Sequence, residues 1–173
     1  MLVFIATTSY DDIPQKYLDD CKDILNNVLS NNDLIFGACG RSVMGLAYNS
    51  AKAHHRKIIG VCPTAYQDDF DGADYDEKII TPTITEATNI MLERSDIILV
   101  LPGGFGTIYE FSQAIQNMLC GAYSKPIIIY NSHGFFDNLL EHIKKLQTEK
   151  FVDDKTLKLF KVVSTKSDLL KLF

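Results

Sequence analysis

The sequence predicts a three-layer α/β fold around a mostly parallel central sheet. Short apolar runs alternate with longer amphipathic segments, and this alternation is typical of βαβ units with right-handed crossovers. The run DIILVLP at 96–102 is continuously apolar, as expected for a central parallel strand that helices cover on both faces. Glycine or hydroxyl residues follow directly after three of the apolar runs, which is typical of turns that lead from a strand into a helix.

The individual elements follow from local patterns. Strands are expected at 2–6, 33–37, 57–63, 96–102, 125–131 and near 159–163. Helices are expected at 13–30, 42–55, 83–94, 105–119, 135–147 and 166–173. Pro14 suits a first helical turn, Thr83 or Thr85 can cap the third helix, and Gly121 ends the fourth. Pro63 ends the third strand.

Segment 64–78 interrupts the alternation because it is acidic, contains Gly72 and lacks periodicity. We expect an irregular surface loop, followed by the short segment EKIIT at 77–81. The acidic residues do not follow the order of a calcium-binding EF-hand loop, so no metal site is expected there.

Length and charge limit the classes of function. A chain of 173 residues fits one domain, spanning 1–173. A net charge of −5 opposes non-specific binding to nucleic acid or to an anionic membrane. The start MLVFIATTSYDD reads as the first strand and not as a signal peptide, and no apolar run approaches the ~18 residues of a membrane span. The four cysteines are scattered, as expected for reduced thiols of a cytoplasmic protein.

The segment LPGGFGTIYE at 101–110 carries the strongest functional signal. It lies between a buried strand and a helix, where free N–H groups and the positive end of the helix dipole favour an anion. Gly103, Gly104 and Gly106 leave the backbone open, and Thr107 adds a hydroxyl donor. We interpret the segment as a phosphate cradle, with a plain tight turn as the alternative. It matches neither the Walker A pattern nor GxGxxG.

Glu110 follows Thr107 by three residues, so both side chains are expected on one face of the helix. At a helix start the carboxylate should stay ionised. It lies about one turn, ~5 Å, above the cradle, which suits contact with the sugar of a nucleotide. The alternative is a glutamate that only complements the helix dipole.

A second loop of the same kind is FGACGRSVMG at 36–45. Glycines relieve its backbone at Gly37, Gly40 and Gly45. Ser42 could cap the following helix, and Arg41 could grip a phosphate or remain a solvated loop residue. The first strand ends in ATTS at 6–9, which supplies hydroxyl groups at the same edge of the sheet.

These segments resemble a known family. PGGFGTIYE matches the pattern PGGxGTxxE of the Lonely-guy proteins and their relatives, often labelled "possible lysine decarboxylase". FGACGRSVMGLAYNSA resembles that family's segment YGGGxxGLMGxVAxxA, and ERSDIILVLPGGFGT resembles ERADAxIxLPGGxGT. The resemblance covers roughly residues 1–147. A pyridoxal-dependent decarboxylase would need a lysine in the pocket, and neither glycine-rich segment contains one.

The resemblance implies a Rossmann-like homodimer that binds a nucleoside 5′-monophosphate and hydrolyses its N-glycosidic bond, with no metal and no cofactor. Glu110 would contact the ribose and stabilise the oxocarbenium-like transition state, or orient water. Phe105 could line the base pocket or pack in the core. The residues expected to bind phosphate or nucleotide are Gly103, Gly104, Phe105, Gly106, Thr107, Thr8, Gly37, Gly40, Ser42 and Met44.

One departure from the family pattern leaves two hypotheses open. The family places Met-His-x-Arg-Lys at the start of the helix before the PGG strand, or Ala-Arg-Asn in related subfamilies. Here the corresponding arginine and lysine positions are Ala87 and Thr88. Either Arg41 supplies the catalytic cation, or the chain binds a nucleotide or a nucleotide-bearing cofactor and cleaves it slowly or not at all. A purely structural dimer is a third class, which the convergence of the loops disfavours.

Overall fold

Seven strands of the computed structural model, which describes residues 1–70 and 73–173, form one sheet with parallel neighbours throughout. They are β1 (Leu2–Ala6), β2 (Asp33–Phe36), β3 (Ile58–Pro63), β4 (Glu77–Thr81), β5 (Ile97–Val100), β6 (Ile127–Tyr130) and β7 (Lys161–Val163). Their order across the sheet is β4-β3-β2-β1-β5-β6-β7. The predicted parallel α/β fold is confirmed.

The strand order reverses between β1 and β5. From β1 the chain builds outward through β2 and β3 to β4, then returns to place β5 on the other side of β1. In the register of this pair Val3 lies opposite Ile97 and Ala6 opposite Val100. In open parallel sheets, ligands bind at such a reversal, beyond the carboxyl ends of the strands.

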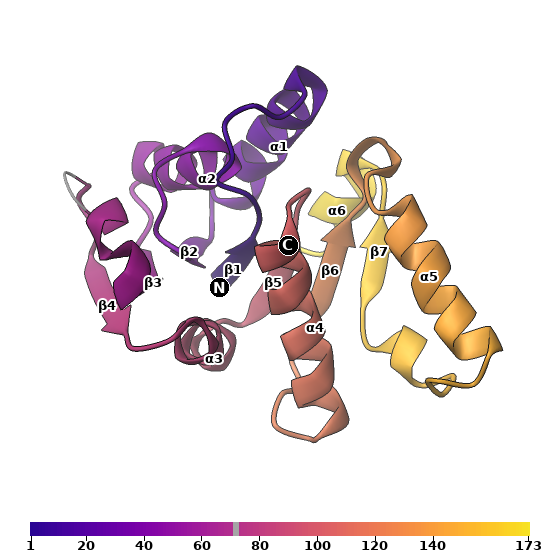
Figure 1. The fold of residues 1–173 in the computed structure, drawn as a ribbon. Coiled ribbons are helices and arrows are strands. Elements are labelled where there is room, and N and C mark those ends of the chain that lie inside the picture. The colour runs from indigo at the N-terminus through magenta and orange to yellow at the C-terminus, as the bar shows by residue number, and fades with distance from the viewer. Residues whose placement is uncertain (71–72) are drawn as a thin grey trace.

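Helices cover both faces of the sheet (Figure 1). They are α1 (Gln15–Val28), α2 (Ser42–Ala53), α3 (Ile84–Arg94), α4 (Phe105–Leu119), α5 (Asp137–Thr148) and α6 (Lys166–Leu170). One apolar cluster joins the sheet to α1, α2 and α6, and the other joins it to α3, α4 and α5. Because strand residues alternate between the two faces, Val3 and Ile5 lie in the first cluster and Phe4 in the second.

Several local signals are confirmed. Helix α4 has the expected bounds and is followed by Gly121 in the left-handed conformation, with φ of 74°. Thr83 caps α3, and its side chain accepts a hydrogen bond from the Glu86 N–H. The first helix differs from the expectation, because Pro14 occupies its N-cap position and not its first turn, so α1 begins at Gln15, two residues later than expected. The second helix ends at Ala53, two residues earlier than expected.

The expectation of an irregular loop over 64–78 is wrong for most of that segment. Thr64–Phe70 forms short 3₁₀ turns, and Glu77–Thr81 forms the edge strand β4. Phe70 and Tyr75 are buried against the sheet. These two aromatic side chains supply the apolar surface that anchors an otherwise acidic segment. Gly72 lies outside the described residues.

Candidate functional site

Three loops meet at the carboxyl edge of the sheet, because β2, β1 and β5 are neighbours there. The Thr7 hydroxyl, after β1, donates a hydrogen bond of 2.9 Å to the Pro102 carbonyl, after β5. The Met44 N–H, in the first turn of α2, donates one of 3.1 Å to the Thr8 carbonyl. The loop after β1 therefore links the two glycine-rich loops, as the sequence predicted.

The glycines of the PGG turn have different local surroundings. A Cβ on Gly103 would lie 2.0 Å from Thr107 Oγ1, so this position must be bare for the turn to pack on its own helix. A Cβ on Gly104 or Gly106 would meet nothing within 4 Å. Gly104 is the N-cap of α4, and the first N–H groups of a helix lack intrahelical acceptors. The open side of this turn can therefore admit an anion.

Thr107 and Glu110 are both buried on α4, with 1% and 8% of their surface exposed. Thr107 Oγ1 and Glu110 Oε2 have no hydrogen-bond partner among the described residues. Buried polar atoms in folded proteins are nearly always paired. This pair of atoms thus has hydrogen-bonding capacity that the chain does not use and a ligand could.

The expectation that Glu110 stays ionised is wrong for this structure. Burial raises the pKa of the Glu110 carboxyl to about 8. Glu110 is the sixth residue of α4, and the stabilising effect of the helix dipole fades beyond the first turn. The Glu110 carboxyl is therefore mostly protonated at neutral pH. Its place beyond the first turn also argues against the alternative that it only complements the helix dipole.

The second glycine-rich loop is tightly folded. Ala38 has a positive φ of 62° and Ser42 one of 50°. A Cβ on Gly45 would lie 2.4 Å from the Gly40 carbonyl oxygen, so the helix start packs directly on the loop backbone. Gly40 itself faces open space, and a Cβ on Gly37 would touch the Met44 side chain at 3.4 Å.

Ser42 does not cap α2, in contrast to the sequence expectation. The N-cap position belongs to Arg41, and Ser42 is the first helical residue. Ser42 has a left-handed backbone, with φ of 50°, and its Oγ is buried without a partner in the part of the chain that the structure describes. Ser42 thus adds a third unused polar atom to the loops at this edge.

Arg41 lies at the rim of the site. Its guanidinium is 3.7 Å from a carboxylate oxygen of Asp11, and both side chains are more than half exposed. Ion pairs of this kind contribute little to stability because water and salt screen them. The Arg41 side chain therefore retains access to solvent.

Phe105 is 91% exposed, which rules out the alternative of core packing. It stands at the first position of α4, beside the open glycines. Tyr109, one turn later, shares a hydrogen bond of 2.9 Å with Thr85 Oγ1 of α3.

The side of α3 near the site lacks the family's basic residues. Ala87 and Thr88 are buried, and the Thr88 hydroxyl donates to the Ile84 carbonyl at 3.0 Å. Where the family pattern has basic residues, α3 therefore carries a buried apolar side chain at Ala87 and a hydroxyl bonded within the helix at Thr88.

Sequence reasoning missed Gln113. Its Nε2 donates to Asn89 Oδ1 of α3 at 2.7 Å, whereas its Oε1 is buried with no partner among the described residues. Thr107, Glu110 and Gln113 follow one another at three-residue intervals and so form a polar stripe on α4. That spacing was the signal from which Gln113 could have been predicted.

Within residues 1–70 and 73–173 no group of His, Cys, Asp or Glu could hold a metal ion, and no helix could span a membrane.

Comparison with known proteins identifies the family of the chain. Residues 44–173 match the family described as "possible lysine decarboxylase". A cytokinin riboside 5′-monophosphate phosphoribohydrolase of Mycobacterium tuberculosis is 34% identical over 140 residues, 80% of this chain and 74% of the relative. One from Arabidopsis thaliana is 28% identical over 157 residues, 90% of this chain and 73% of the relative.

Solved structures share the fold at lower identity. The molybdenum cofactor binding protein of Rippkaea orientalis superposes with a TM-score of 0.72 at 20% identity, covering 99% of this chain and 93% of that one. A Moco carrier protein of Chlamydomonas reinhardtii has the same TM-score at 18% identity and the same coverage. From the family match and the sequence relatives together, the chain belongs to the "possible lysine decarboxylase" family, the family of the Lonely-guy proteins.

Proposed function

We propose that this chain is a nucleoside 5′-monophosphate phosphoribohydrolase. The observation that carries the proposal is the pairing of an open helix start at Gly104 with two unused buried polar atoms, Thr107 Oγ1 and Glu110 Oε2. The open helix start suits a phosphate, and the two buried polar atoms suit the hydroxyl groups of a ribose. The names of the sequence relatives support the same reaction class and a cytokinin ribotide or similar substrate.

In this proposal the phosphate binds to the N–H groups at the start of α4, between Gly103 and Thr107. The sugar then extends along the helix toward Glu110, and the base toward Phe105. Thr8, Gly37, Gly40, Ser42 and Met44 form the facing wall. Arg41, at the rim, supplies the positive charge that α3 lacks.

The reaction breaks the bond between C1′ of the ribose and the nitrogen of the base. The base leaves with the bonding electrons and gains a proton, and a water oxygen bonds to C1′ after losing a proton. Positive charge develops on the ribose between these events. An ionised Glu110 in a site of low dielectric constant would stabilise that charge strongly.

The test is incubation of the purified protein with AMP, CMP, GMP, UMP and isopentenyladenosine monophosphate, followed by chromatography for free base. We expect release of base that is lost in Glu110→Gln and retained in Glu141→Gln, which changes an exposed glutamate on α5. Turnover that survives Glu110→Gln would contradict the proposed role.

A second candidate is a binding protein that holds a nucleotide or nucleotide-bearing cofactor without cleaving it. The observation that favours it is the pair Ala87 and Thr88, buried where the family pattern has basic residues. The names of the structural neighbours, a molybdenum cofactor binding protein and a Moco carrier protein, are compatible with it. The same incubation separates the two: no free base, but a raised melting temperature with one nucleotide, supports binding alone.

We also propose that the chain is a homodimer. Large apolar side chains are exposed beside the site, namely Phe105 at 91%, Ile84 at 48% and Tyr109 at 37%. Apolar surface gathered next to polar groups is typical of protein interfaces. Light scattering after size-exclusion chromatography measures the mass directly, and a mass of one chain would contradict the dimer.

A further inference from the structure

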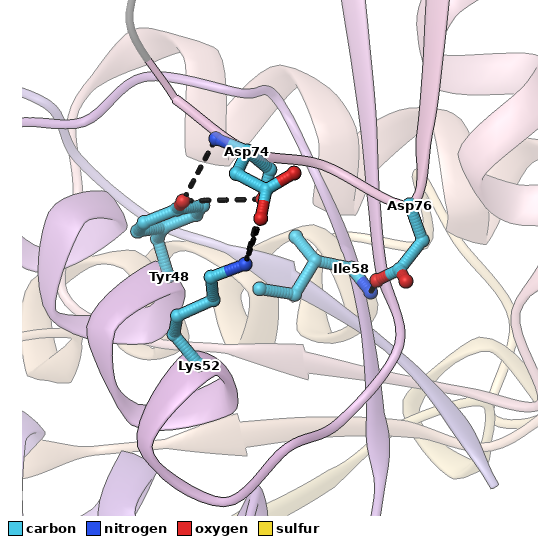
Figure 2. Close-up of polar contacts among 5 residues, drawn as sticks. All are labelled: Tyr48, Lys52, Ile58, Asp74 and Asp76. Atoms are coloured by element: carbon cyan, nitrogen blue, oxygen red, sulfur yellow. Dashed lines mark hydrogen bonds and ion pairs between the residues drawn. The ribbon is translucent and has the colours of Figure 1, made fainter.

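The short segment 73–76 contacts α2 just before the chain enters β4, and we call it the strap. Its outer anchor is Asp74 (Figure 2). The Asp74 N–H donates to the Tyr48 hydroxyl at 3.0 Å, and that hydroxyl donates to the Asp74 carbonyl at 3.1 Å. Lys52 Nζ lies 2.5 Å from Asp74 Oδ2. These contacts fix the strap to the carboxyl half of α2.

The second anchor of the strap is Asp76, which bonds to β3 at Ile58. The Ile58 N–H donates to Asp76 Oδ2 at 2.7 Å, and the Asp76 N–H donates to the Ile58 carbonyl at 3.0 Å. With both neighbours held, the side chain of Tyr75 has a fixed direction. The strap therefore holds Tyr75 by hydrogen bonds of the residues on either side of it.

Tyr75 points inward from the strap to the second glycine-rich loop. Its ring packs against Phe70, Tyr48 and Phe36, with centroids 5.3, 5.4 and 6.1 Å away. Its hydroxyl donates a buried hydrogen bond of 3.0 Å to the carbonyl of Ala38. This contact joins residues that are 37 positions apart in the chain.

Ala38 has a backbone conformation that such a contact would help to maintain. It is fully buried, and its φ of 62° lies in the left-handed region. A residue with a Cβ adopts that conformation only at an energetic cost, which the surrounding structure must offset. The side chains around it are close-packed, since a Cβ on the neighbouring Gly60 would lie 3.0 Å from both Ala38 Cβ and Tyr75 Cδ1.

We propose that Tyr75 is a positioning residue for the nucleotide site. By holding the Ala38 carbonyl, its hydroxyl keeps loop 37–41 in the conformation that faces the phosphate cradle, although Tyr75 belongs to neither glycine motif. The effect on affinity rests on the proposed function. The effect of Tyr75 on the conformation of loop 37–41 does not depend on the proposed function, so an experiment can contradict either one without contradicting the other.

The first test is Tyr75→Phe, which removes the hydroxyl and keeps the ring. We expect the Kd or KM for AMP to rise ~3- to 10-fold, as for the loss of one hydrogen bond, with kcat nearly unchanged. The matched control is Tyr123→Phe, since Tyr123 is buried in the cluster on the opposite face of the sheet. An equal rise in the control, or a change confined to kcat, would overturn the proposal.

The second test does not depend on nucleotide. Cys39 follows Ala38 directly and is 4% exposed, so its rate of modification by a thiol reagent reports opening of the loop. The background is Cys120→Ser, because Cys120 is exposed. We expect Tyr75→Phe to speed modification of Cys39 several-fold and to leave Cys21 and Cys62 unchanged, as peptide mass spectrometry would show. An unchanged rate at Cys39, or equal acceleration at all three, would overturn the proposal.

A rescue variant sharpens the result. Glycine adopts the left-handed conformation without strain, so Ala38→Gly should reduce the effect of Tyr75→Phe on Cys39 in a double-mutant cycle. If the effects of Tyr75→Phe and Ala38→Gly on the rate of Cys39 modification were fully additive, this would contradict a role of Tyr75 exerted through Ala38. Faster Cys39 modification in Tyr75→Phe, combined with no AMP binding by the unchanged protein, would support the hold on the loop and overturn the proposed function alone.

Discussion

The hydroxyl of Thr7 and the carbonyl of Pro102 are joined by a buried hydrogen bond of 2.9 Å that closes the point where the strand order reverses. The two residues follow β1 and β5 and are 95 positions apart. Replacing Thr7 by valine keeps the shape and leaves a buried carbonyl without its donor. We expect the free energy of unfolding in urea to fall by ~1–3 kcal/mol. Thr148→Val, at an exposed helix end, should change it by less than ~0.5 kcal/mol; equal effects would contradict the role of the bond.

Gly103 and Gly104 should respond differently to the same substitution. Gly103→Ala places a Cβ 2.0 Å from Thr107 Oγ1, and we expect a loss of ~1–3 kcal/mol in stability from overpacking. Gly104→Ala meets nothing within 4 Å and should fold normally. It should nevertheless weaken AMP binding about tenfold, ~1.4 kcal/mol, by occupying the space of the phosphate. Thermal unfolding measures the stability of both variants, and titration calorimetry measures their affinity for AMP. Unchanged affinity in Gly104→Ala would exclude the cradle.

The buried carboxyl of Glu110 should make stability depend on pH. Its pKa is raised from 4.5 to about 8 on folding, so the native state holds a proton that the unfolded state releases. The contribution of Glu110 is therefore most favourable below about pH 4.5 and is lost as the pH rises to about 8. The difference in the free energy of unfolding between Glu110→Gln and the unsubstituted protein should therefore grow in favour of the variant from about pH 4.5 to about pH 8, and stay constant above pH 8. A difference that does not vary from pH 5 to 9 would contradict the burial effect.

The same group should shape the pH dependence of catalysis. If the ionised carboxylate stabilises the ribose cation, kcat/KM for AMP should rise through about pH 8, since this parameter reports the free enzyme. The measurement is initial rates of base release from pH 6 to 9. A profile that falls above pH 8 would instead assign the protonated acid to the reaction, as a donor to the leaving base.

Arg41 should matter for binding more than for stability. Its ion pair with Asp11 is exposed, so Arg41→Gln should change the free energy of unfolding by less than ~0.5 kcal/mol. We expect AMP affinity to fall ~3- to 10-fold, an effect that shrinks at high salt. Asp11→Asn is the matched control, because it removes the carboxylate that the Arg41 guanidinium contacts and keeps the positive charge of Arg41. Weaker binding in Asp11→Asn would contradict the model.

The elements with strong local signals could be predicted from the sequence. Helix α4 was placed to the residue because its apolar spacing is regular and Gly104 and Gly121 bracket it. Strand β4 received no assignment because it is an edge strand whose residues are only partly buried. At the proposed site, the glycines and Thr107 could be singled out from their motif, which is a local pattern.

Other properties of the site depend on tertiary packing and could not be predicted. The protonation of Glu110 is set by burial under neighbouring elements, which a position in a helix does not reveal. The contact of Tyr75 with Ala38 joins the strap to a distant loop, and the composition of segment 64–78 suggested solvent and not core.

The position of β1 has a consequence for how the site comes into being. The first strand of the chain lies in the middle of the sheet, and its partner β5 begins only at Ile97. A ribosome-bound chain that has emerged as far as β4 can pair four strands and form the second glycine-rich loop, yet it lacks the turn at 102–107 that we propose binds phosphate. Contacts between such distant segments form late and slowly in folding. A nucleotide bound at the proposed cradle would therefore stabilise the sheet only after β5 has docked beside β1, and it would not guide the pairing of the first four strands.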